Sequence, residues 1–125
     1  MRRISVEKVL VLHKKMINAT GGTDGIREFA LLESALNNAF ITFDGEALYK
    51  TTEEKCANIC YCIVKNHPFV DGNKRMGIYM MLILLEYNDR NLIYSQDELV
   101  DLGMGIANGR YLQEYIQQWI LSHEV

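Results

Sequence analysis

The sequence predicts an all-α protein, a compact bundle of about six helices around a central buried helix. Three observations favour this fold class. The chain has one proline and nine glycines in 125 residues, a composition that suits helices joined by short turns. Apolar residues recur at helical spacing along most of the chain. Hydroxyl residues followed three places later by glutamate, as in Thr51 to Glu54 and Ser95 to Glu98, are typical of helix starts.

The length of the chain favours one domain. A typical domain has about 100–150 residues, and 49% of these residues are hydrophobic, which is enough to build a core. No repeat, low-complexity segment or linker interrupts the sequence. We therefore expect residues 1–125 to form a single domain.

No segment has the pattern of a targeting signal or a membrane span. The longest apolar run, residues 76–85, is much shorter than the about 20 residues that a span needs. The basic amino end is not followed by an apolar run of signal-peptide length. The sequence therefore predicts a cytoplasmic protein that does not contact a membrane.

The charge balance argues against nucleic acid as a partner. Thirteen lysines and arginines stand against sixteen acids, for a net charge of −3. The chain therefore has no overall basic field. Any anion that it binds must be held by a local site.

The three cysteines are Cys56, Cys60 and Cys62, an odd number at a spacing that matches no zinc motif. A disulfide framework is not expected, which fits a reducing compartment. We interpret these cysteines as packing residues on one helix.

The amino-terminal half predicts two helices and a loop. Ser5 can cap a helix that runs to about Asn18, and the glycine-rich segment 21–25 ends it. A second helix is expected over residues 27–40, and a loop over 42–50. The face expected to be buried on the first helix consists of Val6, Val9, Leu10, His13 and Ile17.

The third helix has the strongest signal. Thr51 provides its cap, and it must end near Asn66 because Pro68 disfavours helical geometry at the residue before it. One unbroken apolar face is formed by Cys56, Ile59, Cys60, Ile63 and Val64.

Three helices follow. Residues 74–87 are expected to form the fourth helix, and residues 78–85 within it are apolar on all sides, a pattern typical of a buried central helix. Ser95 opens a fifth helix, which we expect to end around Gly103 and Gly105. A sixth is expected over residues 110–123.

Residues 67–75, between the third and fourth helices, concentrate groups that suit phosphate chemistry. Unsatisfied N–H groups at the start of a helix attract anions, and Gly72 allows the backbone to approach closely. Asp71 is a hard oxygen ligand suited to Mg²⁺. His67 can accept a proton near neutral pH. Asn73, Lys74 and Arg75 can bind phosphate oxygens.

Each of these residues also has a purely structural interpretation. Lys74 and Arg75 can form a solvated first turn, Asp71 and Gly72 a tight turn, and His67 a helix end. Their combination in one short loop favours a site for phosphoryl or nucleotidyl transfer to a hydroxyl. We interpret the neighbouring Phe69 and Val70 as packing residues, with Phe69 anchoring the loop in the core.

The stretch 67–75 resembles the Fic/Doc signature H-P-F-x-[D/E]-G-N-[G/K]-R at every fixed position. Lys74 stands where Fic AMP-transferases have glycine, and in this the chain is similar to the Doc (death-on-curing) toxins. The resemblance covers essentially the whole chain, including residues 1–5 and 21–36. The sequence is thus identified as a member of the Fic/Doc (Fido) family, Doc branch.

This resemblance implies an all-α Fido domain that serves as the toxin of a type II toxin–antitoxin pair. Doc toxins are kinases that transfer the γ-phosphate of ATP to a threonine of elongation factor Tu and so stop translation. The lysine at 74 implies a reversed nucleotide that presents its γ-phosphate rather than its α-phosphate. The implied catalytic residues are His67, Asp71 and Arg75, with Mg²⁺ at Asp71 and ATP held by Gly72, Asn73, Lys74 and Arg75.

Two alternatives stay open. Doc toxins of phages can differ at Pro68 and Gly72, where this chain is similar to Fic proteins, so AMP transfer by the same loop is the first. The second is a catalytically idle Fido domain that only binds a partner, against which the presence of both His67 and Asp71 weighs.

The family also implies how such a protein is restrained. Many Fic proteins inhibit themselves with an [S/T]-x-x-x-E-[G/N] helix. Only Thr42 and Glu46 come close to this motif, and Ala47 follows instead of glycine or asparagine. We therefore expect a separate antitoxin protein as partner.

Overall fold

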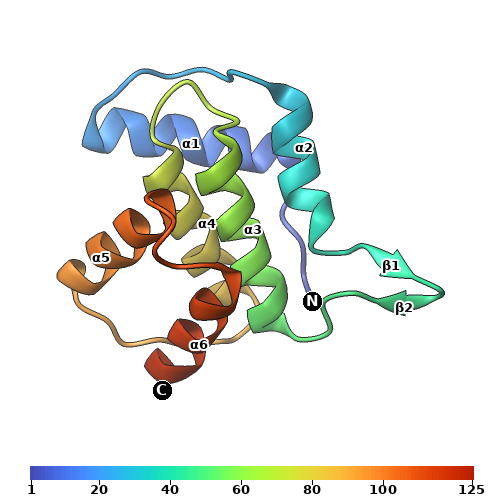
Figure 1. Ribbon diagram of the computed structural model, residues 1–125. Coiled ribbons are helices and arrows are strands. Elements are labelled where there is room, and N and C mark those ends of the chain that lie inside the picture. Colours follow the sequence, from blue (N-terminus) through green and yellow to red (C-terminus); the bar gives the residue numbers. More distant parts are fainter.

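Six helices hold 62% of the chain, so the predicted all-α fold class is confirmed. The computed structural model describes residues 1–125 (Figure 1). Its elements in chain order are α1 (Val6–Thr20), α2 (Phe29–Asn38), β1 (Thr42–Phe43), β2 (Glu46–Ala47), α3 (Thr52–Asn66), α4 (Asn73–Tyr87), α5 (Gln96–Ala107) and α6 (Gln113–His123).

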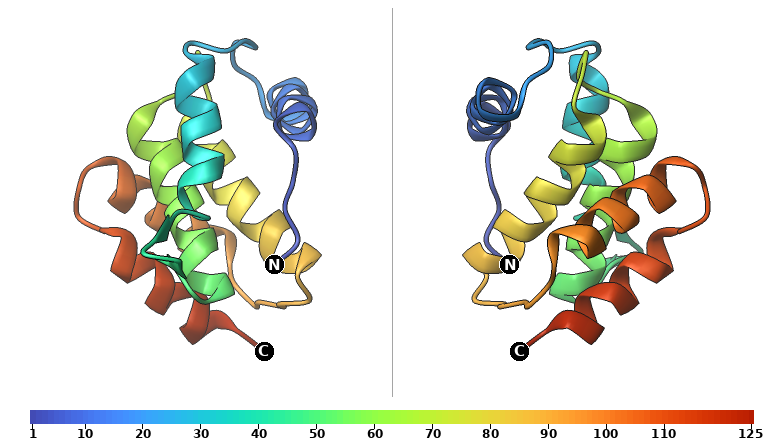
Figure 2. Two further views of the ribbon diagram at one scale, coloured as in Figure 1. Left: turned by 90° about the vertical axis from the view of Figure 1, so that its right-hand side faces the viewer. Right: turned by 90° about the vertical axis from the view of Figure 1, so that its left-hand side faces the viewer.

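The core is one cluster of 26 buried residues built around α3 and α4. Helix α3 contacts α2, α4, α5 and α6. Helix α4 is largely buried, as its apolar sequence predicts, but Tyr79 is 36% exposed. Helix α1 lies beside the α3–α4 pair, and α6 lies at the far end of the molecule (Figure 2). The loop between α3 and α4 is therefore fixed by the two best-packed helices.

The three predicted hydroxyl caps are present. The side chain of Ser5 accepts a hydrogen bond from the N–H of Lys8, and Thr51 caps α3 in the same way. Ser95 and Glu98 form a complete capping box at the start of α5. These bonds satisfy N–H groups that a helix start otherwise leaves free.

Several predicted boundaries and faces need correction. Helices α2 and α6 begin two and three residues later than expected, at Phe29 and Gln113. In α1 the buried face includes Leu12 and Met16 instead of Val6 and Leu10, which are half-buried. The buried face has turned because α1 packs against both α2 and α4.

Helix α5 does not end at its glycines, as the sequence suggested, but continues to Ala107. A Cβ atom at Gly105 would lie 2.1 Å from the ring of Tyr111. The glycine is therefore needed for the close approach of this ring. It does not break the helix, because tertiary packing outweighs its low helix propensity.

The predicted loop 42–50 contains a small antiparallel hairpin, which projects from the body of the protein (Figure 1). Asp44 and Gly45 form its turn with φ angles of 53° and 80°, the positive values that a two-residue hairpin turn requires. Thr42 and Glu46, which come closest to the self-inhibitory motif, thus lie on strands rather than on a helix.

The cysteines are free thiols on α3, in agreement with their interpretation as packing residues. Cys56 and Cys60 are completely buried. Burial raises the pKa of the Cys56 thiol to about 12, so this thiol stays protonated at neutral pH. Separately, none of the helices combines the length and apolar character needed to cross a membrane.

Candidate active site

The candidate site lies where α3 ends and α4 begins. Helix α3 ends at Asn66, and His67 follows in the left-handed conformation with a φ of 51°. Helix α4 begins directly after Gly72, whose φ is 77°. These two left-handed residues turn the chain sharply out of one helix and into the next. The predicted residues 67–75 therefore lie together at one end of the helix pair (Figure 1).

Phe69 fixes the middle of this loop in the core, as predicted. It is 1% exposed, and its ring stacks on that of His13 with 3.9 Å between the ring centroids. The Nε2 atom of His13 lies 2.9 Å from the carbonyl oxygen of Asp71. Sequence analysis assigned His13 only to a buried helix face. In the structure it holds the backbone next to the candidate metal ligand.

Asn73 also holds the loop. Its Oδ1 accepts a hydrogen bond from the N–H of Phe69, and its Nδ2 donates to the carbonyl of the same residue, each at 3.0 Å. The side chain is 8% exposed. The Asn73 carboxamide, which was expected to bind phosphate, thus bonds to the loop backbone instead. The backbone N–H of Asn73 is the group of this residue that remains for an anion at the start of α4.

The segment before α2 pairs with the same loop along the backbone. The N–H of Arg27 donates to the carbonyl of Pro68 at 2.8 Å, and that of Val70 donates to the carbonyl of Gly25 at 3.1 Å. Ile26 and Phe69 form an isolated antiparallel bridge. A second chain segment therefore supports the outer side of the loop.

The side chain of Arg27 completes this support. Its Nε donates to the carbonyl oxygen of His67 at 2.6 Å, and its Nη2 donates to that of Asn66 at 2.8 Å. These carbonyls belong to the end of α3, where the last carbonyls have no partner within the helix. Sequence analysis assigned Arg27 no role, because nothing near it in the sequence points to residues about forty positions away. In the structure it positions the backbone of the candidate base.

His67 exposes an imidazole that is free at one nitrogen. Its Nδ1 lies 3.3 Å from the carbonyl oxygen of Lys65, the only hydrogen-bond contact of the ring. A proton on Nδ1 suits this contact and leaves the lone pair on Nε2. Nε2 is therefore the atom that can accept a proton from a substrate.

Asp71 is held by backbone N–H groups on both oxygens. Its Oδ2 accepts from Thr23 at 3.0 Å and its Oδ1 from Gly72 at 2.8 Å. These two bonds lower the pKa of the Asp71 carboxyl below the ordinary value of 3.8, so Asp71 is a carboxylate at neutral pH. A carboxylate has about four lone-pair positions, so the 46% exposed side chain keeps acceptor capacity for a cation.

Arg75 links the start of α4 to the end of α1. Its Nη1 donates to the hydroxyl of Thr20 at 2.6 Å and to the carbonyl of Gly21 at 2.8 Å, and its Nη2 lies 3.9 Å from the Asp71 carboxylate. A Cβ atom at Gly22 would be 2.6 Å from Asp71 Oδ2. The glycine-rich segment, which was predicted only to end the first helix, thus packs directly against the site.

The start of α4 offers an anion site. No side chain caps its first N–H groups, which belong to Asn73, Lys74 and Arg75. The helix dipole adds positive charge at this point. Lys74 is exposed and forms no ion pair. A groove of about 360 Å³ between α4 and α5 opens beside it, lined by Lys74, Arg75, Ile78, Gln96, Leu99, Val100, Gly103 and Met104.

Fold and site define a helical protein in which an imidazole with one free nitrogen and a partly exposed carboxylate lie on one short loop that leads into a helix start without a side-chain cap. Residues 3–85 match the sequence model of the Fic/DOC family. This match covers more than half of the chain, and the chain belongs to the Fic/DOC family.

Two curated relatives carry the Doc name. The chain is 28% identical over 109 residues to "Protein kinase doc" of Escherichia phage P1, an alignment that covers 87% of this chain and 85% of the relative. It is 35% identical over 57 residues to "Toxin Doc" of Mycolicibacterium smegmatis, which covers 46% of this chain and 44% of that relative. The predicted family resemblance is confirmed.

Proposed function

We propose that this protein is a Doc-type toxin and acts as a protein kinase that uses ATP with Mg²⁺. One observation carries the proposal: His67, an exposed imidazole with a free Nε2, lies on the short loop that leads into the uncapped start of α4. This arrangement suits transfer of a phosphoryl group to a hydroxyl, because such transfer depends on positioning and charge neutralisation. The similarity to a relative named protein kinase supports the choice of reaction.

Each residue then has a defined role. His67 Nε2 accepts the proton of the attacking hydroxyl while that oxygen forms a bond to the γ-phosphorus and the bond to the bridging oxygen of ADP breaks. Lys74, Arg75 and the N–H groups of the first turn of α4 hold phosphate oxygens. The groove between α4 and α5 provides apolar surface for the nucleoside.

The residues present fit a magnesium ion that arrives with the nucleotide. No group of three or more metal-binding side chains exists in the chain, so the protein would provide one carboxylate, Asp71. Mg²⁺ is commonly bound by one or two carboxylates together with phosphates and water. When bound, the ion would supply positive charge against the phosphates.

The target hydroxyl and the partner follow from the same proposal. We place the target on a translation factor, a threonine of elongation factor Tu, as in the Doc branch that the sequence resembles. No helix carries the self-inhibitory motif, since Thr42 and Glu46 lie on the hairpin. This supports restraint by a separate antitoxin.

AMP transfer is the second candidate, and Pro68 and Gly72 favour it because Fic proteins share them. The structure gives Gly72 a reason that is independent of the reaction. A Cβ atom there would lie 2.9 Å from Met16, and the φ of 77° is itself unfavourable for other residues. The glycine thus fits either reaction, and the choice between them falls to experiment.

The deciding experiment uses ATP labelled at the α- or the γ-phosphate. The purified protein is incubated with Mg²⁺ and purified elongation factor Tu, and in parallel with bacterial lysate. Label from γ alone supports the kinase, and label from α shows AMP transfer instead. A folded protein that transfers neither label overturns both reactions and supports the alternative of a catalytically idle domain that only binds a partner. Transfer in lysate but not to elongation factor Tu refutes the proposed target alone.

A further inference from the structure

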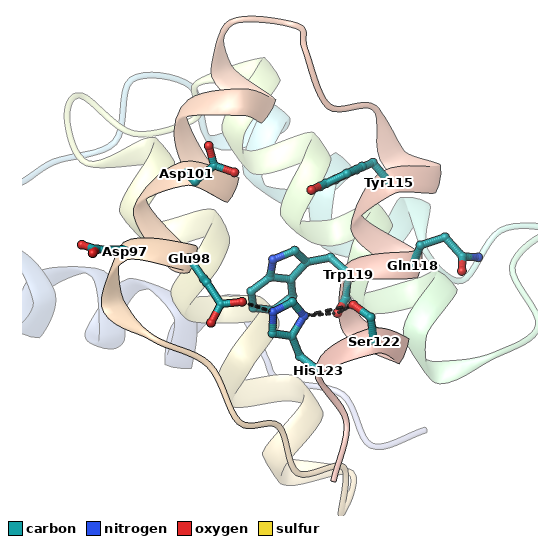
Figure 3. Close-up of a pocket in the computed structure, with 8 residues that line it drawn as sticks. All are labelled: Asp97, Glu98, Asp101, Tyr115, Gln118, Trp119, Ser122 and His123. Atoms are coloured by element: carbon teal, nitrogen blue, oxygen red, sulfur yellow. Dashed lines mark hydrogen bonds and ion pairs between the residues drawn. The ribbon is translucent and has the colours of Figure 1, made fainter.

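A second hollow, of about 530 Å³, lies between α5 and α6 and shares no residue with the candidate active site (Figure 3). Helix α5 contributes one wall and α6 the other. Nothing in the proposed kinase reaction uses it. Its lining consists of Asp97, Glu98, Asp101, Tyr115, Gln118, Trp119, Ser122 and His123.

The α5 wall is acidic. Asp97, Glu98 and Asp101 line it, and the lining includes no lysine or arginine. Asp101 accepts hydrogen bonds from Arg110 at 2.8 Å and from the hydroxyl of Tyr111 at 2.7 Å. Asp97 forms neither a hydrogen bond nor an ion pair and is exposed. One carboxylate of this wall is therefore free to pair with a cation.

Glu98 is paired with His123 across the hollow. His123 Nε2 donates to the Glu98 carboxylate, and its Nδ1 donates to the carbonyl of Trp119 at 2.7 Å. An imidazole that donates from both nitrogens is protonated. The pair is thus neutral as a whole, and Asp101 is paired with Arg110, so one uncompensated negative charge remains in the lining, that of Asp97.

The α6 wall is aromatic. Tyr115 is 42% exposed and stacks on Tyr111 with ring centroids 3.8 Å apart. His123 stacks on Trp119 at 4.0 Å. Stacking fixes these rings in place, so they form a rigid surface opposite the carboxylates. An aromatic face beside carboxylates is favourable for an organic cation, because the ring face is also electronegative.

Trp119 provides a second, independent group to which a ligand can bind. The residue is 6% exposed, yet its indole Nε1 forms no hydrogen bond. A buried indole N–H normally has an acceptor. This N–H is not sealed inside the protein either, since the only fully enclosed side-chain atom without a partner is Oε2 of Glu53. In Figure 3 the indole nitrogen lies on the side of the ring that faces α5. The hollow therefore presents a donor that the acceptor oxygen of a ligand can reach.

We propose that this hollow binds a basic segment of a partner polypeptide. An arginine or lysine side chain lies against Asp97 and the aromatic wall, and a carbonyl oxygen of the same segment accepts from Trp119 Nε1. The two requirements, a cation and a nearby acceptor, are met together by a peptide. A polyamine carries no acceptor, and no group of side chains here could hold a metal ion.

The test uses the fluorescence of Trp119, the single tryptophan of the chain. The full chain is titrated with an acetylated and amidated tripeptide, glycyl-arginyl-glycine, and with its analogue in which citrulline replaces arginine. A saturable change is expected with the arginine peptide, at least about tenfold weaker binding with citrulline, and weakening with salt. Spermidine is expected to bind less tightly than the arginine peptide.

Two variants locate the binding. Asp97→Asn removes the free carboxylate and should weaken binding of the arginine peptide about threefold, the size of one partly exposed ion pair. Glu7→Gln is the matched control, because Glu7 is also an exposed acid in the first turn of a helix, α1. It should bind the peptide as the unmodified protein does.

Four titration results would overturn the proposal. These are the absence of a saturable change, equal binding of the citrulline peptide, tighter binding of spermidine than of the arginine peptide, and equal loss in Asp97→Asn and Glu7→Gln. A second readout, the NMR shift of the Trp119 indole N–H, must move with the peptide. A fluorescence change without that shift also contradicts the proposal.

Discussion

In both the loop after α3 and the hollow between α5 and α6, most polar side chains are hydrogen-bonded to neighbours. The two regions carry net charges of opposite sign. In the loop, Asp71, Asn73 and Arg75 are all hydrogen-bonded, and the unpartnered groups are His67 Nε2 and the Lys74 ammonium. In the hollow, Glu98 and His123 are paired, and the unpartnered groups are the Asp97 carboxylate and Trp119 Nε1. Each region thus keeps two unpartnered groups among hydrogen-bonded neighbours, an arrangement that leaves those groups available for a ligand.

The regions differ in what holds them. Contacts from α1, the segment before α2 and the core reach the loop, and Phe69 is fully buried beneath it. The hollow depends on pairs between two neighbouring elements near the surface, such as Glu98 with His123 and Asp101 with Tyr111. Changes in the loop should therefore have large effects on activity and stability, and changes in the hollow small ones.

The largest effect is expected for His67→Ala. Loss of a general base lowers the rate about 10²- to 10⁴-fold, whereas the fold should be retained because the His67 side chain is exposed. The measurement is the initial rate of γ-phosphate transfer, with circular dichroism to check the fold. Lys65→Ala is the control, since it keeps the backbone carbonyl that His67 Nδ1 contacts. A His67→Ala protein with full activity would rule out the general-base role.

Phe69→Ala tests whether the core fixes the loop. Removing a fully buried phenylalanine costs about 3–5 kcal/mol, and here it also removes the stacking on His13. Chemical denaturation gives the free energy of unfolding. Phe43→Ala is the matched control, because Phe43 is 79% exposed on the hairpin and should change stability by less than about 0.5 kcal/mol. Similar losses in the two variants would contradict the role given to Phe69.

Arg27→Ala tests the positioning of His67 and should have an intermediate effect. It removes the bonds to the carbonyls of Asn66 and His67, and charged hydrogen bonds of this kind contribute about 1.5–3 kcal/mol. We expect kcat to fall about tenfold, because a small displacement of a catalytic group is costly. The KM for ATP should be unchanged. A rise in KM with unchanged kcat would instead place Arg27 in nucleotide binding.

The features that could be predicted from the sequence are those whose cause is local. The caps at Ser5, Thr51 and Ser95 and the apolar face of α3 depend on residues within one or two turns. The loop could be predicted for the same reason, because its imidazole, carboxylate and cations are contiguous. Phe69 was assigned to the core correctly, since a large apolar side chain on a short loop between two core helices is most favourably buried between them.

The features that sequence analysis missed depend on contacts between distant segments. His13 and Arg27 reach the loop from 58 and 40 positions away, and neither belongs to a local motif. Gly105 was taken for a helix end because only the ring of Tyr111 explains it. The hollow was not predicted, because its lining comes from two helices whose packing the sequence does not specify.

The smallest effect is expected where the hollow is held by Glu98 and His123. Burial opposes protonation of His123, but the hydrogen bonds to Glu98 and to the Trp119 carbonyl outweigh it and raise the pKa of His123 above its ordinary value of 6.5. The hydrogen bond from His123 lowers the pKa of Glu98 below 4.5. The stabilisation from His123 is complete below pH 6.5 and is lost as the pH rises through the raised pKa of His123. The stabilisation from Glu98 is complete above pH 4.5 and is lost as the pH falls through the lowered pKa of Glu98. The pair therefore stabilises the fold most between these two values.

Glu98→Gln tests this window without removing the helix cap, because glutamine can also close a capping box. The Tm difference between the unmodified protein and the variant should be largest near pH 5.5, about the middle of the window, and should shrink as the pH rises through the raised pKa of His123. Asp97→Asn is the matched control, since Asp97 lies in the same first turn of α5 and has no partner. Its Tm difference should stay nearly constant over this range. If the Glu98→Gln difference is equally constant, the pair of Glu98 and His123 contributes no pH-dependent stability.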